Sequence, residues 1–177
     1  TFREEGWGGQ DTLRIHGYAS TDVAVSASGE DVFLTFAGTS DRVTLLRSLN
    51  NAYWSDSGFE TITFDDGVSW LMSDVRTMVH AARATSGDDT ILGSGLADRL
   101  TGKAGNDLLQ GGGGDDSYDF RAGDGWDSIV EGTWGGTDVL YIHDFLPEDA
   151  VVTVSGDDVR LTFASTGDSV ELSDSLT

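Results

Sequence analysis

A run of nine-residue repeats in the middle of the chain constrains the fold more than any other feature. Four consecutive segments share glycines near the start, aspartate at the sixth position and a large apolar residue at the eighth. They span residues 84–119 and read ATSGDDTIL, GSGLADRLT, GKAGNDLLQ and GGGGDDSYD. Two less regular units follow, RAGDGWDSIV and TWGGTDVLY. One nonapeptide cannot bury its apolar residue alone, so the units must stack on one another.

Each unit divides into a glycine-rich turn and a short strand. Glycine permits positive φ and close approach of neighbouring backbones, and in the strand only the eighth residue points inward. Two units make one coil, so each turn lies beside the turn two units later. The aspartates expected to meet are Asp89 with Asp107, Asp98 with Asp116, Asp107 with Asp127, and Asp116 with Asp138.

Carboxylates stacked in this way need a cation between them. Two like charges about 4 Å apart repel by roughly 1 kcal/mol in water, and by several times more near a protein surface. The chain has no cysteine, and the array has no histidine, so zinc and copper lack their preferred ligands. Irregular sites made only of oxygen ligands suit Ca²⁺ better than octahedral Mg²⁺.

The array resembles the RTX (repeats-in-toxin) calcium-binding parallel β-roll over about 84–130, with weaker turns to about 141. The resemblance implies that three to four Ca²⁺ ions are held by sixth-position carboxylates: Asp89, Asp98, Asp107, Asp116, Asp127 and Asp138. It also implies ligands from turn carbonyls around Gly93, Gly95, Gly102, Ala104, Gly111 and Gly113. Leu96 stands where a glycine is expected, and the first unit lacks its first two glycines, so sites at those turns should be weak.

A second, longer repeat flanks the array. Residues 7–45 align with 134–172 without a gap and are identical at 21 of 39 positions. We expect a β-rich module over 1–72 that includes the end of a preceding roll, a linking helix over 73–84, the roll over 85–141, and a partial second copy of the module over 142–177. The fold class is therefore all-β with one short helix. The duplication indicates that this segment contacts neighbouring tandem modules of the same chain.

The flanking sequence resembles the haemolysin-type calcium-binding-related domain, through its FDDGVSW stretch at 64–70 and its GGxDxL start. Its strands read as short, Val-, Ile-, Thr- and Phe-rich segments separated by turns. An open roll end would expose unpaired backbone. These strands are therefore expected to extend or cap the roll, and the sequence leaves open whether they instead form a separate sandwich.

Composition and motifs exclude several classes of protein. The net charge of −21 opposes binding to nucleic acid, and no apolar run is long enough to span a membrane. No GxSxG, HExxH or phosphate-loop motif is present. His16 and His143 are equivalent in the long repeat, which favours a structural role, and His80 should be a surface or packing residue. We therefore expect no enzymatic activity.

The RTX resemblance implies a calcium-induced folding module of a large secreted bacterial protein, exported unfolded by a type I system and related to toxins. Two alternatives remain open from sequence. One is a tandem-repeat surface adhesin that binds a host-surface or glycan ligand with calcium, for which Trp54 is a candidate stacking residue. The other is an accessory module of a secreted enzyme or cytotoxin, with the activity elsewhere.

Overall fold

The computed structural model describes residues 11–46, 49, 60–132 and 136–174. Trp54 lies outside these residues. The chain divides into two compact units, Thr1–Ala82 and Arg83–Thr177. Strands dominate both, and one α-helix is present in the described part, so the expected all-β class with a single short helix is confirmed.

Two three-stranded sheets form the first unit. In one, β1 (Thr12–Ile15) runs parallel to β5 (Thr61–Phe64), which pairs antiparallel with β6 (Ser69–Leu71). The other is an antiparallel meander of β2 (Val23–Ser28), β3 (Asp31–Phe36) and β4 (Arg42–Leu45). A short 3₁₀ helix, η1 (Ser20–Asp22), precedes the meander.

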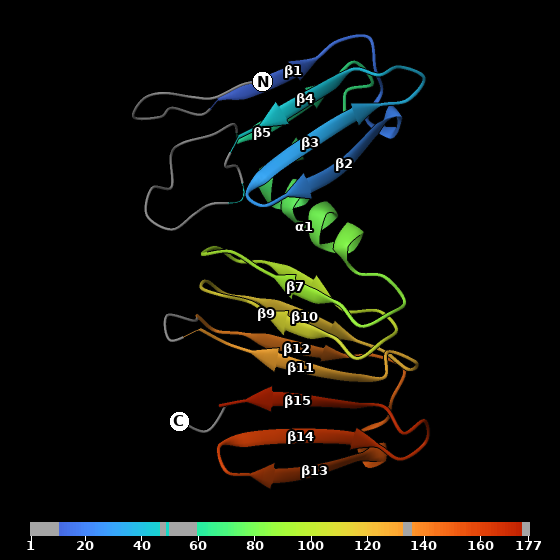
Figure 1. Cartoon of the computed structure of the whole chain (residues 1–177), viewed down its shortest axis with the longest axis vertical. Helices are drawn as coiled ribbons and strands as arrows, with labels where there is room; N and C mark the ends of the chain where they lie inside the picture. The colour runs from blue at the N-terminus through green and yellow to red at the C-terminus, as the bar shows by residue number, and fades with distance from the viewer. Residues whose placement is uncertain (1–10, 47–48, 50–59, 133–135, 175–177) are drawn as a thin grey trace. The chain divides into compact units, whose positions relative to one another are not determined.

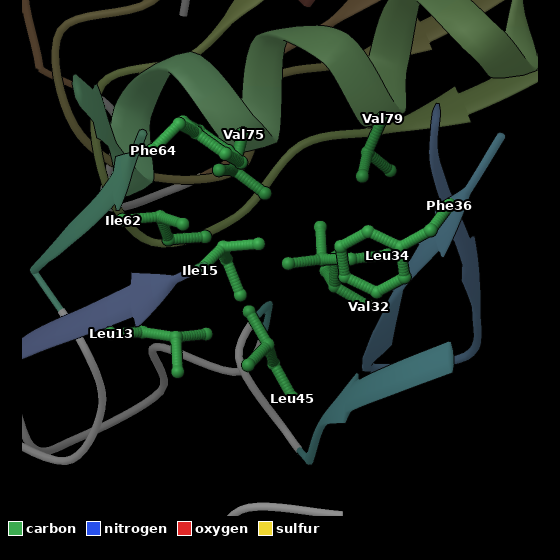
Figure 2. Close-up of a cluster of buried hydrophobic side chains, with 10 residues drawn as sticks. All are labelled: Leu13, Ile15, Val32, Leu34, Phe36, Leu45, Ile62, Phe64, Val75 and Val79. Atoms are coloured by element: carbon green, nitrogen blue, oxygen red, sulfur yellow. The ribbon is translucent and has the colours of Figure 1, made fainter. Parts of the chain in front are cut away.

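Helix α1 (Met72–Arg83) packs on the core of the first unit. Asp74 accepts a hydrogen bond from the Leu71 backbone N–H (2.8 Å), which places a carboxylate at the positive end of the helix. Val75 and Val79 are one helical turn apart, and both are buried. Figure 2 shows their side chains pointing into the cluster that contains Ile15 and Leu34.

The second unit begins with the roll. Its six short strands are β7 (Thr90–Leu92), β8 (Arg99–Thr101), β9 (Leu108–Gln110), β10 (Ser117–Phe120), β11 (Trp126–Val130) and β12 (Val139–Ile142). Alternate strands pair in parallel, so β7, β9 and β11 form one layer while β8, β10 and β12 form the other (Figure 1). This is the two-unit coil expected from the nonapeptides.

The C-terminal strands extend the roll. After η2 (Pro147–Asp149) come β13 (Ala150–Ser155), β14 (Asp158–Phe163) and β15 (Ser169–Ser173). Strand β14 pairs antiparallel with both β13 and β15, and β15 pairs in parallel with β11 of the roll. The resulting sheet has the order β13-β14-β15-β11-β9-β7. In this copy, therefore, the flanking strands continue a roll sheet.

The inward positions of the repeats make the core of the second unit. The eighth residues of the first five units are buried, at no more than 4% exposed: Ile91, Leu100, Leu109, Tyr118 and Ile129. Phe120, Phe145 and Phe163 complete the core, with ring centroids 4.0 Å apart for Phe145 and Phe163 and 5.6 Å apart for Phe120 and Phe163. The flanking strands and the roll thus share one hydrophobic core.

The long repeat is visible in the structure as well. Strands β1, β2, β3 and β4 each begin 127 residues before β12, β13, β14 and β15, respectively. The register is also kept, because Val32 pairs with Leu45 just as Val159 pairs with Leu172. The two copies are therefore the same supersecondary unit in two settings.

Truncating Phe163 to alanine is expected to destabilise the second unit by about 3–5 kcal/mol, because it removes a buried ring from the aromatic stack. The matched control is Val151→Ala, at an exposed position where the first copy has Ala24. Urea unfolding in saturating calcium measures both. Equal stability of the two variants would contradict the shared core.

Candidate metal centre

The sixth-position aspartates meet in the pairs that the repeat predicts. The backbone N–H groups of Asp89, Asp98, Asp107 and Asp116 each donate to an aspartate Oδ1 of the turn two units later. The acceptors are Asp107 (2.7 Å), Asp116 (2.8 Å), Asp127 (3.1 Å) and Asp138 (2.9 Å), respectively. One oxygen of each accepting carboxylate is thereby fixed against the neighbouring turn.

The second oxygen of three of these carboxylates has no hydrogen-bond partner. Oδ2 of Asp107, Asp116 and Asp127 is buried and unpaired, and these residues are only 1–2% exposed. Burying a carboxylate oxygen without a partner is costly, and a bound cation or a proton relieves that cost. The orphaned oxygens therefore fit a hard cation between the turns.

Asp89 and Asp98 differ from these three. Thr85 donates from its backbone N–H (2.6 Å) and its hydroxyl (2.8 Å) to Oδ2 of Asp89. Ser94 does the same for Oδ2 of Asp98, at 2.6 and 2.7 Å. Both donors stand at the second position of their units, where Gly112 stands in the unit of Asp116. Their hydroxyls satisfy the oxygen that a metal would otherwise take, consistent with weak sites at these two turns.

In the units of Asp107 and Asp116, the first glycine leaves room for the aspartate of the same unit. A Cβ on Gly102 would lie 2.1 Å from Oδ2 of Asp107, and a Cβ on Gly111 would lie 2.3 Å from Oδ2 of Asp116. A side chain at either position would collide with the carboxylate. The ligand roles of the carbonyls around Gly93, Gly95, Gly102, Ala104, Gly111 and Gly113 stay predictions.

The turns of alternate units stack into two rows, which we call turn columns, and one of them contains Asp98, Asp116 and Asp138. Glu131 lies beside Asp116 and Asp138 of this column. Among residues 11–46, 60–132 and 136–174, one group of three acidic residues has carboxylate oxygens that all lie within 4.8 Å of one another: Asp116, Glu131 and Asp138. The Tyr118 hydroxyl hydrogen-bonds Oε1 of Glu131, whereas Oε2 is buried and unpaired. Sequence reasoning missed Glu131 because it follows a strand and lies outside the glycine turns. The one signal was its alignment with Glu4 in the long repeat.

Burial shifts the titration of these carboxylates. Desolvation, with neighbouring carboxylates adding to it, raises the pKa of Asp116 and that of Asp127 to about 7. Burial also raises the pKa of Asp107 and of Glu131 above the ordinary values. Without a cation the roll therefore favours protonated carboxyls at these positions.

Acid is accordingly expected to stabilise the metal-free roll. A raised folded-state pKa contributes stability that is complete below the ordinary value of 3.8 and is lost as the pH rises through about 7. Lowering the pH from 8 to 5 in chelator should therefore increase the β signal in circular dichroism. With saturating calcium this gain should vanish, because the cation holds the same oxygens. A metal-free spectrum that loses β signal over this range would contradict the assignment.

A different carboxylate is fully paired. Asp119 accepts two hydrogen bonds from Arg99 (2.6 and 2.9 Å) and one from His143 Nε2 (2.8 Å). Burial acts to raise the pKa of Asp119, but these partners outweigh it and the pKa is lowered. In the first unit, His16 lies 2.9 Å from Asp65, and His80 is buried in helix α1.

The parallel coil, its glycine turns and its oxygen-lined turn columns define a calcium-binding β-roll. Residues 92–127 match the RTX calcium-binding nonapeptide repeat (4 copies), and residues 31–74 match the haemolysin-type calcium binding protein related domain. The chain therefore contains RTX calcium-binding repeats together with a domain of this second family. Calcium is the ion of these repeats.

Two solved structures are similar to parts of the chain. The solution structure of the AlgE6R3 subunit from the Azotobacter vinelandii mannuronan C5-epimerase is 28% identical, covers 51% of this chain and 67% of its own, and has a TM-score of 0.25. The crystal structure of extracellular lipase LipA from Serratia marcescens is 18% identical, covers 93% of this chain and 30% of its own, and has a TM-score of 0.32. This chain thus spans less than a third of the lipase.

No curated protein matches the chain significantly. Over the residues that the structure describes, no helix has the length and apolar character needed to cross a membrane.

Proposed function

We propose that this chain is a calcium-induced folding module of a secreted bacterial protein, exported unfolded by a type I system and folded outside the cell. The observation that carries the proposal is the set of buried, unpaired carboxylate oxygens on Asp107, Asp116 and Asp127, together with that on Glu131 beside them. A roll with these groups ionised and no cation is unstable, so folding and calcium binding are one equilibrium.

The charge of the chain supports the same coupling. At −21 the metal-free chain repels itself, and three to four bound Ca²⁺ ions would offset six to eight of these charges. Extracellular calcium modules bind at about 10⁻⁴ to 10⁻³ M, well above cytosolic calcium. The array would therefore stay unfolded before export and fold after it. RTX repeats are typical of secreted bacterial proteins, which agrees with this order of events.

The proposal assigns no catalysis to this chain. Asp119, His16 and His143 are engaged in pairs with one another or with Asp65, and the buried, unpaired oxygens of the roll are assigned to calcium. Any activity, toxic or enzymatic, would belong to other segments of the secreted protein.

The test is a calcium titration of the whole chain, with Mg²⁺ as the control ion. The hydrodynamic radius and the near-ultraviolet circular dichroism are measured at each calcium concentration. The proposal predicts an expanded second unit in chelator and cooperative compaction near millimolar calcium only. Calcium binding without compaction, or a fully compact chain in chelator, would overturn it.

A further inference from the structure

The two copies of the long repeat are covered differently. In the first copy, Ile15 of β1 is 7% exposed and Leu34 of β3 is fully buried. Their counterparts in the second copy are Ile142, which is 36% exposed, and Leu161, which is partly buried. Identical residues in the same register are thus buried in the first copy and more exposed in the second, where Leu161 still packs against the core of its own unit.

The same contrast continues onto the neighbouring strand. Val25 and Ala27 of β2 are partly buried and pack against the core of the first unit. Their counterparts on β13, Val152 and Val154, are 61% and 60% exposed. We call the surface formed by the exposed Ile142, Val152 and Val154 and bordered by the partly buried Leu140, Val159 and Leu161 the open end of the second copy.

In the first copy, the β5–β6 hairpin and helix α1 cover residues whose counterparts are exposed in the second copy. Strand β5 pairs with β1, β6 pairs with β5, and α1 follows. These elements place Ile62, Phe64, Val75 and Val79 in one buried cluster with Leu13, Ile15 and Leu34 (Figure 2). In the second copy, β12 is an edge strand of its sheet, with β10 on one side only.

The free backbone edge of β12 matches the edge of β1 that pairs with β5. Val139 and His143 donate their N–H groups to β10, at Asp116 O and Phe120 O (both 2.9 Å). Since successive residues of a strand face opposite edges, the N–H groups of Leu140 and Ile142 point to the open edge. In the first copy the equivalent edge is the one paired with β5, where Asp11 O accepts from Thr61 N–H (3.3 Å).

We propose that the open end of the second copy is a docking surface for a strand–hairpin–helix segment with the pattern of residues 60–83, supplied in tandem by a neighbouring module of the same kind. The added strand would pair with β12, and its helix would cover Val152 and Val154. An exposed strand edge beside apolar residues is otherwise a site of unspecific association. This inference does not depend on the calcium proposal.

The test extends the whole chain after Thr177 with a second copy of residues 51–83, which keeps the 127-residue spacing of the repeat. Amide exchange is measured by NMR in saturating calcium. The proposal predicts that the Leu140 and Ile142 amides exchange at least about tenfold more slowly than in the unextended chain. It also predicts a second helix in far-ultraviolet circular dichroism.

The matched control carries Ile62→Asp and Val75→Asp in the appended copy only, so the chain itself is unchanged. It should give neither the protection nor the second helix. The proposal would be overturned if the Leu140 and Ile142 amides exchanged as fast in the extended chain as in the unextended one. Equal protection of these amides in the control would overturn it as well. Concentration-dependent protection of the unextended chain, with a dimer in sedimentation, would overturn it too, since a second copy would then be the occupant.

Discussion

Removing calcium is expected to unfold the roll while leaving the first unit folded. The roll holds buried carboxylate oxygens of Asp107, Asp116 and Asp127 that have no protein partner. The acidic turn at Asp65-Asp66 of the first unit is built differently, because these carboxylates accept hydrogen bonds from the backbone N–H groups of Gly17 and Ser20. Its core is built on Leu13, Ile15 and the apolar cluster around them, and among the described residues the buried, unpaired carboxylate oxygens all belong to the second unit.

Hydrogen exchange with mass spectrometry of the whole chain, before and after chelation, resolves the two units. Peptides from β7 to β11 should lose their protection in chelator, whereas peptides from β1 to β6 should keep it. Restoring calcium should restore the roll, and magnesium should not. Loss of protection in both units together would show that the first unit also depends on the ion. Protection retained in both units would show that the roll folds without calcium, which contradicts the proposal.

Replacing Asp116 with asparagine is expected to have opposite effects with and without calcium. Asp116 is 1% exposed, its Oδ1 accepts the Asp98 N–H, and its Oδ2 is buried and unpaired. A carboxylate oxygen of Asp116 groups with those of Glu131 and Asp138. Asparagine can keep the Oδ1 acceptor but removes the charge. Calcium affinity should fall about tenfold or more, since even outer partners of a metal site cost that much. The metal-free roll should become more stable, because a buried charge is gone.

Asp115→Asn is the matched control. Asp115 is the neighbouring acid, is exposed, and accepts a hydrogen bond from the Thr137 backbone N–H (2.8 Å) through Oδ1. It loses the same charge without touching a buried, unpaired oxygen, so calorimetric calcium binding should change little. If the two variants lost affinity equally, overall charge rather than the turn column would govern binding.

The roll could be predicted from sequence because its period fixes its geometry. Once two nonapeptides make a coil, the turn of Asp98 must lie beside that of Asp116, and Ile91, Leu100 and Leu109 must point inward. No other knowledge of the fold is needed, and each of these placements is found. The same holds for the helix, where Ser73-Asp74 and the spacing of Val75 and Val79 carry the signal.

Contacts outside the period could not be predicted in this way. Thr85 and Ser94 satisfy carboxylates through local side-chain geometry, and Glu131 reaches the Asp116 column from beyond a strand. The pairing of β15 with β11 joins segments 43 residues apart. Alternating strands of this kind suit either a roll extension or a sandwich, so the choice depends on the tertiary packing of Phe163 and Phe145.

The most direct test of the calcium assignment is an anomalous difference map from crystals of the whole chain grown with Ca²⁺. The account predicts peaks between the turns, beside Oδ2 of Asp107, Asp116 and Asp127, at oxygen distances of about 2.3–2.6 Å. The peak at Asp116 should also contact Glu131 or Asp138. Peaks confined to exposed acids such as Asp115, with the turn columns empty, would contradict it.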